Sequence, residues 1–503
     1  MKKVHISMIN LGCNKNLVDS QLFLWKLLNE NWDKIEYYSD PYEKNVEIVI
    51  LNTCSFISSG REEMFQTVEK LLSKKKKVCI IWCGVQYFEK LLRKNLSPFL
   101  KEGDHEVVED FYLWDSLPLL RGKVACDKGV KIPLGFAVSP FKNGEQNGYN
   151  QQLKLEFQRW EKMLENKNIS YLSRNDLTFA NLQNLTKRSQ TFDDFCRYSA
   201  PRLLTNYENR YEYLKIAEWC NNSCAFCIIP QIRWKLTSLS IKSVLIDAEN
   251  LLKQWVEELI IVAQDTMRYG TDFSSKSQLL PLLHELDKFP YDFKYRILYL
   301  YPDILTLKQL EEFASLEKFI PYFDIPLQHI SPKILKSMGR FYDDKMIHTL
   351  LKWIHSLFQN PFIRTNIIIW FPWETDEDMQ LLQSFLDEDY FDNIALFEYH
   401  DEPLAKSSTF ENKVPDDVVH SRFKTIRTQV DKLLKAHEKR RKWKNQIGFV
   451  EWINEKKGQI FLSVRPEINC PEIDPVDEVK LENIIQCFDG EEIEIWSKVK
   501  YRI

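Results

Sequence analysis

Short apolar runs alternate with amphipathic stretches in the first quarter of the chain. Three runs rich in β-branched residues predict buried strands: Val4–Asn10, Val46–Asn52 and Val78–Trp82. Leu17–Asn29 and Arg61–Ser73 lie between these runs and have the apolar spacing of helices. Because strands that alternate with helices usually form parallel sheets, we predict that residues 1–135 form a parallel α/β domain with a flavodoxin-like fold.

A second and longer series of strand-like runs follows between residues 210 and 400. Helical stretches separate most of its members. The runs are Tyr211–Ala217, Glu258–Val262, Tyr295–Leu300, Phe319–Ile325, Phe362–Ile369 and Ile394–Tyr399. Six strands that alternate with helices indicate a partial TIM barrel of the (β/α)6 kind, which we assign to residues 206–440. In such a barrel the chemistry lies at the carboxyl ends of the strands.

The remaining segments differ from these repeats. Residues 136–205 are rich in Asn and Gln, as in NGEQNGYNQQ, and we interpret them as a polar insertion or linker of open role. Residues 441–503 contain short alternating strands, such as GQIFLSVR, which predict a small β-barrel. A long basic helix at Val418–Lys444 precedes this barrel, and its basic face is either solvated or in contact with RNA phosphates.

Composition narrows the class of protein. The 503 residues carry a formal net charge of −4, which argues against bulk electrostatic binding to nucleic acid. No apolar run approaches the ~20 residues of a membrane span, and MKKVHISMINLGC lacks the long apolar stretch of a signal peptide. The 11 cysteines, without secretory context, suggest metal-bound or buried thiols in a reducing compartment. We therefore expect a cytoplasmic protein.

Three closely spaced cysteines, Cys220, Cys224 and Cys227, give the most specific chemical signal. Their spacing supplies three thiolates to a four-iron cluster and leaves one iron open to a small molecule. The aromatic residue Phe226 precedes the third cysteine. A zinc site would usually close with four ligands in paired CxxC or CxxH units, and no second pair follows here. We predict a [4Fe-4S] cluster, with zinc or unrelated buried thiols as the alternatives.

A second set of cysteines follows the three N-terminal strands. Cys13, Cys54 and Cys83 each come just after one predicted strand. Because the carboxyl ends of parallel strands share one edge of a sheet, these cysteines should converge although they are distant in sequence. That geometry suits a second three-thiolate cluster, and the alternative is three buried cysteines.

The text around the cysteines resembles a known family. The segment YLKIAEWCNNSCAFCIIP is similar to the signature of radical S-adenosylmethionine (SAM) enzymes, in which SAM binds the open iron. With its two triads, the chain closely resembles the methylthiotransferases, and its C-terminal barrel resembles their TRAM domain. The shared pieces include LGCNKNLVDS, LNTCSFI, VAQDT, LYLYP, DIPLQHIS and the FPxET region. The resemblance covers nearly all of the chain outside residues 140–205.

Three pieces, AQDTMRYG, DIPLQHIS and CPEID, are most similar to the RimO-type branch of that family. This resemblance implies addition of a methylthio group to the β-carbon of an aspartate in the S-twelve protein of the small ribosomal subunit. It implies two [4Fe-4S] clusters and SAM as cofactors. The cluster at Cys220, Cys224 and Cys227 would make the radical, and the cluster at Cys13, Cys54 and Cys83 would hold the sulfur. It also implies an electron donor such as flavodoxin or ferredoxin, and no membrane.

The same resemblance implies further residues near SAM. Those residues are Phe226, Gln264, Asp265 and Arg364. Arg364 would lie beside the carboxylate or ribose of SAM, and Gln328 and His329 follow the fourth barrel strand. The alternative for each polar residue is a buried, hydrogen-bonded group at a strand end. A single histidine such as His329 is more often structural than catalytic.

Two other functions remain open. The first is the same chemistry on a tRNA adenosine, and the second is a catalytically inactive, metal-stabilised protein that binds the ribosome. A tail that binds RNA should be basic, whereas residues 447–503 are acidic, which favours a basic protein partner. The acidic residues include Glu451, Glu455, Glu472, Asp474, Asp477, Glu478, Glu491, Glu492 and Glu494.

Glycine is scarce and tryptophan is abundant. There are 14 of each, whereas glycine usually makes up about 7 % of a protein. Motifs that contain glycine in the family contain tryptophan here, so that EGC becomes EWC and GFPGET becomes WFPWET. We hypothesise that a gene whose UGA codons encode glycine has been translated with UGA as tryptophan. The positions in question are Trp25, Trp32, Trp82, Trp219, Trp234, Trp255, Trp370, Trp373 and Trp496.

Overall fold

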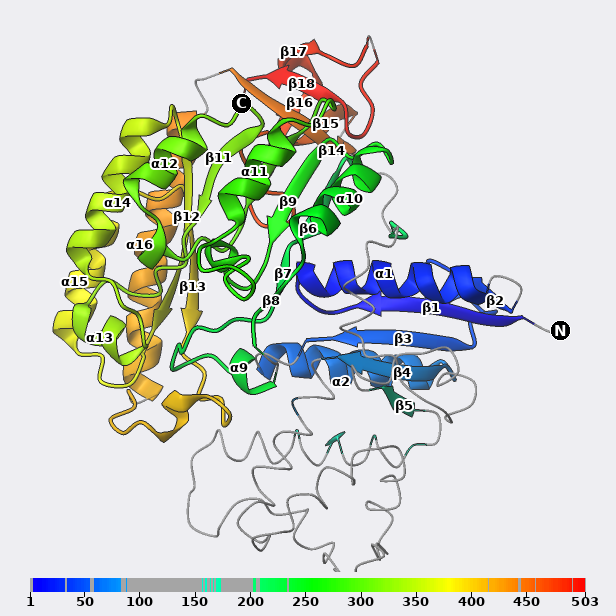
Figure 1. Cartoon of the computed structure of the whole chain (residues 1–503), viewed down its shortest axis with the longest axis horizontal. Coiled ribbons are helices and arrows are strands. Elements are labelled where there is room, and N and C mark those ends of the chain that lie inside the picture. Colours follow the sequence, from blue (N-terminus) through cyan, green and yellow to red (C-terminus); the bar gives the residue numbers. More distant parts are fainter. Residues whose placement is uncertain are drawn as a thin grey trace, which may run out of the picture. The chain divides into compact units, whose positions relative to one another are not determined.

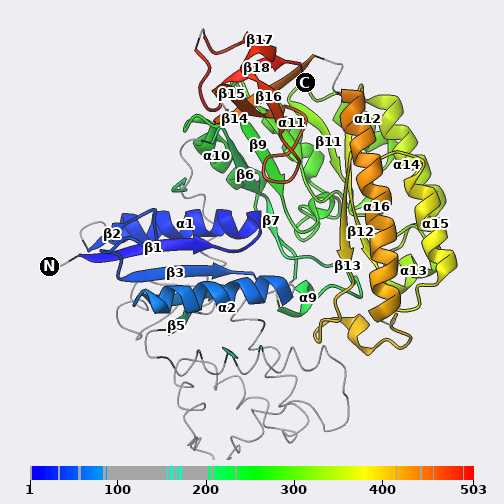
Figure 2. The same ribbon diagram turned by 180° about the vertical axis from the view of Figure 1, so that it is seen from behind.

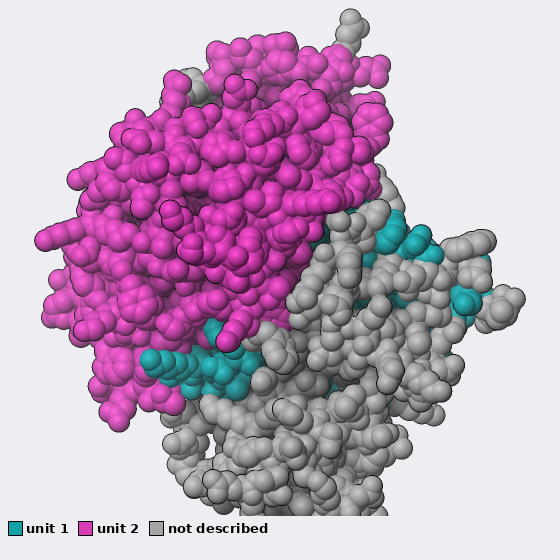
Figure 3. Space-filling model, viewed as in Figure 1, with its two compact units in different colours: residues 1–205, 228–234, 400–408 teal, residues 206–227, 235–399, 409–503 magenta. Residues whose placement is uncertain are grey.

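The computed structural model consists of two compact units, drawn in teal and magenta in Figure 3. Unit 1 contains Met1–Thr205, Ile228–Trp234 and His400–Ser408, and unit 2 contains Asn206–Cys227, Lys235–Tyr399 and Thr409–Ile503. The residues that the structure describes are 3–31, 34–54, 58–82, 87, 156, 159, 160, 163, 166, 169–172, 202–204, 209–232, 235–414, 416–441, 445–456, 458–490 and 492–502. Cys83 and most of the predicted insertion at 136–205 lie outside the described residues.

Unit 1 is built on a five-stranded parallel sheet in the order β2-β1-β3-β4-β5. The strands are β1 (Val4–Asn10), β2 (Ile35–Tyr37), β3 (Ile48–Thr53), β4 (Lys77–Trp82) and β5 (Ile169–Leu172). Helix α1 (Asn14–Asn31) follows β1, and helix α2 (Ser58–Ser73) follows β3. The parallel α/β arrangement predicted from the sequence is confirmed, because the three expected strands are β1, β3 and β4.

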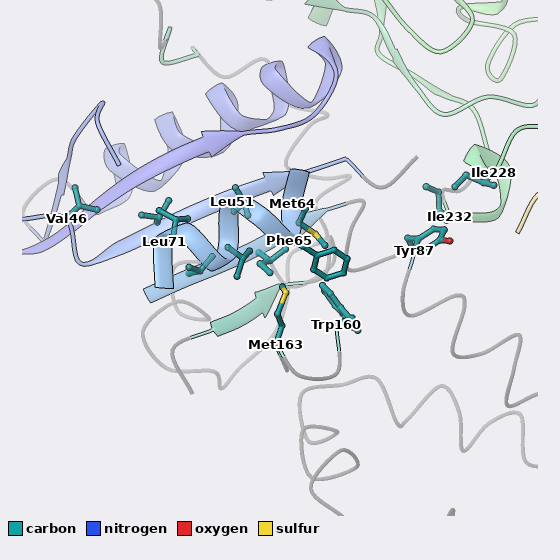
Figure 4. Close-up of a cluster of buried hydrophobic side chains, with 14 of the residues drawn as sticks. Val46, Leu51, Met64, Phe65, Leu71, Tyr87, Trp160, Met163, Ile228 and Ile232 are labelled. Carbon is teal, nitrogen blue, oxygen red and sulfur yellow. The ribbon is translucent and has the colours of Figure 1, made fainter. Parts of the chain in front are cut away.

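The two helices of unit 1 cover opposite faces of its sheet. Phe65 of α2 shares a buried cluster with Leu51 of β3 (Figure 4), whereas Phe23 of α1 shares another with Ile50, the preceding residue of the same strand. Consecutive strand residues point to opposite faces, so each apolar strand feeds both clusters. This explains why β3 and β4 are nearly continuous apolar runs rather than alternating ones.

Unit 2 contains a six-stranded parallel sheet in the order β13-β12-β11-β10-β9-β6. Its strands are β6 (Tyr211–Lys215), β9 (Glu258–Val262), β10 (Lys294–Ile297), β11 (Phe319–Asp324), β12 (Phe362–Ile369) and β13 (Asn393–Glu398). Figures 1 and 2 show the helices along its outer side. These are α10 (Ile241–Leu252), α11 (Leu279–Asp287), α12 (Leu307–Ala314), α14 (Asp344–Leu357), α15 (Asp376–Leu386) and α16 (Asp416–Arg441). Sequential strand order, with β13 and β6 as edges, confirms the partial barrel.

Two predicted strands end earlier than the apolar pattern suggests. The run Tyr211–Ala217 divides into β6 and the short β7 (Ala217–Glu218), which pairs with β8 (Thr237–Ser238). Strand β10 ends at Ile297 because Tyr299 takes a φ of +61° and donates its amide to Asp324 Oδ2 at 3.0 Å. Both differences turn strand-end residues into loops at the carboxyl edge of the sheet.

The C-terminal residues form a separate antiparallel sheet in the order β16-β15-β14-β18-β17. Its strands are β14 (Gln446–Lys456), β15 (Gln459–Pro466), β16 (Asp477–Lys480), β17 (Ile484–Cys487) and β18 (Lys498–Tyr501). Val450, Val464 and Tyr501 lie in its buried core. We call residues 445–502 the C-terminal module, and its sheet agrees with the predicted all-β segment.

Buried charges join the C-terminal module to the barrel floor, which is the end where the barrel strands begin (Figure 1). The guanidinium of Arg296 is fully buried and contacts Glu258 at 2.5 Å. It also donates to the carbonyl oxygens of Ile468 and Glu467, at 2.7 and 2.9 Å. Arg465 of β15 lies 3.2 Å from the same Glu258 carboxylate. Segment 466–474 of the module therefore packs on the barrel floor.

The predicted basic helix corresponds to α16, although residues 442–444 lie outside the described part of the chain. Some of its basic charge is used within the protein. His437 Nε2 and Arg440 Nη1 both lie 2.6 Å from the Asp389 carboxylate, and Arg422 lies 2.6 Å from Asp376. Neither α16 nor any other described helix is long and apolar enough to cross a membrane.

Candidate active site

The cysteine loop, residues 219–227, leaves β7 at the carboxyl end of the barrel. It contains Cys220, Cys224 and Cys227, and all three are partly exposed. The segment that follows α13 (Pro332–Ser337) supports the loop, because Ala225 N donates to Met338 O at 2.8 Å. Gly339 has a φ of +74°, and a Cβ on it would lie 2.7 Å from Ser223 O. Only glycine allows these two backbones to approach so closely.

The donor set suits an iron–sulfur cluster. No group of three or more His, Cys, Asp or Glu side chains among the described residues is arranged around a single metal ion. A four-iron cluster binds each thiolate through a different iron, so its ligands need not converge on one point. Burial raises the pKa of the Cys220 thiol to about 11, so metal binding near neutral pH must displace its proton. Three thiols on one loop therefore fit the predicted cluster.

Asp265 holds the cysteine loop in position. Its side chain is 2 % exposed, and its Oδ2 accepts a hydrogen bond from Asn222 Nδ2 at 2.7 Å. Arg268 lies 3.1 Å from the same carboxylate oxygen and donates to Asn222 Oδ1 at 3.0 Å. Burial raises the pKa of Asp265, and the contacts with Asn222 and Arg268 oppose that rise. The three side chains form a closed triangle between the loop and the end of β9.

Several polar side chains of the barrel strands, and of the loops that follow them, contain fully buried atoms that lack a hydrogen-bond partner among the described residues. They include Gln264 Oε1, Asp265 Oδ1, Arg340 Nε, Arg364 Nε and Asn366 Oδ1. Arg364 is held at its other end, where Nη1 donates to Asp324 Oδ1 at 2.7 Å. Buried polar atoms nearly always have partners, so these atoms could hold a polar ligand. The carboxylate, amino and hydroxyl groups of SAM are complementary to such donors and acceptors.

Arg340 is a residue of this site that sequence reasoning missed. Its guanidinium lies 4.4 Å from the ring centre of Tyr301 and 5.6 Å from that of Phe226, in the range of cation–π contacts. Phe226 packs on an apolar cluster formed by Ala225, Ile334, Met338 and Phe371. The aromatic residue before the third cysteine therefore anchors the loop and covers Arg340.

Gln328 and His329 have structural partners. Gln328 has a φ of +72° and bonds through its backbone to Asn366 and Ile368 of β12, at 2.7 and 2.8 Å. His329 is fully buried, and its Nδ1 accepts from Ser331 N at 3.0 Å. Burial lowers the pKa of His329 to about 4, so the ring is neutral near pH 7. These contacts favour a structural role for His329.

Glu374, the glutamate of the FPxET piece, closes the turn after β12, a role that sequence reasoning did not assign to it. Its Oε2 accepts a hydrogen bond from Trp370 N at 2.7 Å. Arg422 of α16 lies 3.5 Å from Glu374 Oε1 and 3.3 Å from its backbone oxygen. Burial raises the pKa of Glu374 to about 7. The hydrogen bond between the Trp370 amide and Glu374 fixes the path of residues 370–374 beside the carboxyl end of β12.

In unit 1, Cys13 and Cys54 follow the adjacent strands β1 and β3, and both are at least partly exposed. Cys83 comes directly after β4, the next strand of the sheet, but lies outside the described residues. A buried hydrogen bond of 2.8 Å from Asn52 Nδ2 to Asn16 O ties the end of β3 to the start of α1. The structure thus brings two of the three predicted ligands to one sheet edge.

Two protein families match parts of the chain. Residues 214–386 match the Radical SAM superfamily, and residues 4–98 match a family described as uncharacterized protein family UPF0004. Each match contains one cysteine triad.

Several curated relatives bear the name ribosomal protein uS12 methylthiotransferase RimO. The relative from Pseudothermotoga lettingae is 31 % identical and covers 93 % of this chain and 92 % of its own length. The one from Dictyoglomus thermophilum is 30 % identical, over 100 % of this chain and 98 % of its own. The one from Clostridium novyi is 29 % identical, over 100 % and 97 %.

Among solved structures, the radical SAM methyltransferase TsrM from Kitasatospora setae gives a TM-score of 0.43 at 11 % identity, covering 79 % of this chain and 75 % of that one. The sequence relatives, and not this distant likeness, carry the family assignment.

Proposed function

Because this chain belongs to the ribosomal protein uS12 methylthiotransferases, a family of radical SAM enzymes, we propose that it adds a methylthio group to an aspartate β-carbon of that ribosomal protein. One observation carries the proposal. The cysteine loop leaves the barrel at the carboxyl end of its strands. Gln264, which lies just after β9 at that end, and Arg340, which lies over Phe226 of the loop, both have buried polar atoms without partners among the described residues. That end is where barrels of this type carry their chemistry.

In this proposal Cys220, Cys224 and Cys227 hold a [4Fe-4S] cluster with one open iron. With SAM bound there, the cluster supplies one-electron chemistry that can remove a hydrogen atom from an unactivated carbon. Gln264 and Arg364 hold polar groups of SAM through their unpartnered buried atoms. Asp265 acts on the loop through Asn222 and so orients the thiolates, and its Oδ1, which is buried without a partner among the described residues, is available to the same ligand as Gln264.

The N-terminal domain, residues 1–135, supplies the second cluster in this proposal. Cys13, Cys54 and Cys83 would hold it at the carboxyl edge of the sheet, and its open iron would supply a binding place for the sulfur that is transferred. Thiolates are soft ligands and suit such sulfur handling. Residues 206–440 are the radical SAM barrel, and residues 441–503 are a TRAM-like domain.

The surface of the C-terminal module supports a basic protein as substrate. Asp474 and Asp477 are buried, and Glu451 pairs with Arg465, so part of the acidic charge faces inward. The exposed acidic residues are Glu455, Glu472, Glu478, Glu482, Asp489, Glu492 and Glu494, whereas the exposed basic residues described there are Lys456 and Arg502. This excess of negative charge favours a basic ribosomal protein over RNA. An electron donor such as flavodoxin or ferredoxin, and a cytoplasmic location, complete the proposal.

The test is an anaerobic reaction of the iron-reconstituted protein with SAM, sulfide, a reductant and purified uS12. We expect about eight iron atoms per chain and a mass increase of uS12 equal to one methylthio group in place of hydrogen. A transcript of tRNA serves as the competing substrate. Modification of the tRNA and not of uS12 would overturn the substrate assignment.

Matched cysteine variants test the ligand assignment separately. Cys224→Ala should lower the iron content to about four per chain and abolish SAM cleavage. Cys487→Ala is the control, because Cys487 is a partly exposed cysteine of the C-terminal module and belongs to neither triad. Full iron content in Cys224→Ala would exclude that cysteine as a ligand.

A further inference from the structure

Five tryptophans have a backbone conformation that belongs to glycine. They are Trp219, Trp255, Trp370, Trp373 and Trp496, with φ between +70° and +72°. The glycines Gly270, Gly339 and Gly458 have φ of +80°, +74° and +75°. A Cβ in this region approaches the following carbonyl oxygen, so bulky residues are rare there and glycine is the usual occupant.

The other described tryptophans have ordinary backbone conformations. They are Trp25 in α1, Trp82 in β4, Trp160 in a helical stretch, Trp353 in α14 and Trp452 in β14. The ten described tryptophans therefore divide into two groups, one inside helices or strands and one at φ near +70°. A single misplaced tryptophan could be a local peculiarity of one turn. Tryptophan, however, supplies five of the 12 described non-glycine residues with positive φ, and this recurrence points to a common cause.

The surroundings of these residues also suit glycine. Trp255 stands in the turn after α10, a place where glycine commonly ends a helix, and its side chain is 88 % exposed. The amides of Trp370 and Trp373 are held by Glu374 Oε2 at 2.7 Å and Asn412 O at 3.0 Å. These hydrogen bonds to the backbone amides hold the turn without the indole rings, which pack on Phe423 and Phe410.

We propose that the native polypeptide carries glycine at 219, 255, 370, 373 and 496, because its gene uses UGA as a glycine codon. The backbone supports five of the nine positions that the sequence singled out. Trp25 is helical and Trp82 is extended, so the backbone gives no reason for glycine at either. Trp32 and Trp234 lie outside the described residues. The inference rests on backbone geometry and does not depend on the proposed function.

This assignment changes the candidate site. Trp219 precedes Cys220 directly, and its side chain is buried, with 1 % exposed. Trp370 is 4 % exposed and Trp373 is partly exposed, beside the turn that Glu374 closes. With glycine at these three positions, the carboxyl end of the barrel loses three indole rings. The space gained lies next to the cysteine loop and next to the end of β12, where a ligand of the size of SAM would bind.

The direct test reads the gene and the protein from the native cell. We expect UGA codons at the five positions, UGG at Trp160, Trp353 and Trp452, and glycine in the corresponding native peptides by mass spectrometry. UGG codons at the five positions, or tryptophan in those native peptides, would overturn the proposal.

A second test uses full-length protein made in a host with the standard code. Trp255→Gly should raise the thermal unfolding midpoint, because it removes backbone strain and loses almost no packing. Trp353→Gly in α14 is the matched control and should lower that midpoint. The variant with all five glycines should unfold at a higher temperature than the chain as printed. A lower midpoint for Trp255→Gly would contradict the assignment, whatever the activity of the protein.

Discussion

Asn222 of the cysteine loop donates a hydrogen bond to the carboxylate of Asp265 at 2.7 Å, and so joins the loop to the end of β9. The Asp265 carboxylate also lies 3.1 Å from Arg268, which itself donates to Asn222. Both side-chain contacts of Asp265 therefore stabilise the cysteine loop. Asp265 thus helps to fix the position of the cysteine side chains. Loss of Asn222 or Asp265 should therefore affect iron binding by the cysteine loop more than other properties of the protein.

The first prediction concerns this pair. Asp265→Ala leaves Asn222 and Arg268 without their shared acceptor, and should destabilise the fold by about 1–3 kcal/mol. The reconstituted variant should bind roughly half of the iron of the unmodified protein, because only the cluster of the N-terminal triad keeps its support. Asp292→Ala, at an exposed position, is the control. Full iron content in Asp265→Ala would show that the loop holds its shape without this contact.

Two glycines with nearly equal φ separate backbone strain from steric contact. Gly339→Ala places a Cβ 2.7 Å from Ser223 O, whereas Gly458→Ala meets nothing within 4 Å. Both variants should lose about 1 kcal/mol from the strained backbone. Gly339→Ala should in addition push the cysteine loop away and reduce iron binding. The test measures the iron content per chain and the free energy of unfolding of both variants. Equal iron contents in Gly339→Ala and Gly458→Ala would contradict the prediction.

The pH dependence of stability should carry the signature of Glu374. Its pKa is about 7 in the folded chain and 4.5 ordinarily, so between these values the folded chain keeps a proton that the unfolded chain has lost. The stabilisation from this proton is complete below pH 4.5 and is lost as the pH rises through 7. The gap corresponds to about 3 kcal/mol. Glu374→Gln is neutral at every pH and still offers an oxygen to the amide of residue 370.

Urea unfolding at several pH values measures this effect. The free energy of unfolding of Glu374→Gln, relative to that of the unmodified protein, should increase by about 3 kcal/mol between pH 4.5 and 7.5. His329 has its pKa lowered to about 4 and has the opposite pH dependence, but it is present in both proteins and cancels. The exposed Glu311→Gln should give a flat difference. A flat difference for Glu374→Gln as well would rule out a raised pKa.

Arg296 should be the most sensitive residue of the barrel floor. Arg296→Met removes a fully buried partner of Glu258 and two hydrogen bonds to segment 466–474, and should cost about 3–5 kcal/mol. Limited proteolysis should then release the C-terminal module. Arg210→Met, whose pair with Glu257 is about one-third exposed, is the matched control and should cost less than about 1 kcal/mol. Similar losses in both variants would mean that burial of the pair is unimportant.

Much of the architecture could be predicted from sequence periodicity. Strands β3, β4 and β9 are largely continuous apolar runs because both faces of a parallel sheet are buried, whereas the other strands contain polar residues and were located from the alternation of strand-like and helical stretches. Strand ends were less predictable, as Tyr299 shows. Its side chain suits a strand, but its positive φ follows from a hydrogen bond to Asp324 of the neighbouring strand. Such tertiary contacts leave no periodic trace.

The candidate site divides in the same way. The cysteines are recognisable from their spacing. Gln264 and Asp265 lie just after β9, whereas Arg364 is the third residue of β12 and lies away from the carboxyl end of that strand. Sequence reasoning missed Arg340 and Glu374, since what matters about each is its partner: the rings of Phe226 and Tyr301, or the amide of Trp370. Each of these contacts depends on how the loops that follow different strands pack together. The local sequence around Arg340 or Glu374 does not determine that packing.

The charged floor of the barrel has a consequence for biosynthesis. Arg296 donates to carbonyl groups 171 and 172 residues further along the chain, so its partners are translated long after the strand that carries it. At about 5–20 residues per second, the floor waits roughly 10–30 s for them. An apolar floor would be an exposed, aggregation-prone surface during that interval. Glu258 and Arg296 can pair with each other and remain hydrated on the open floor, and the carbonyl oxygens of Glu467 and Ile468 replace that water once segment 466–474 arrives. The nascent barrel can therefore stay soluble, because the surface it leaves open is one that water tolerates.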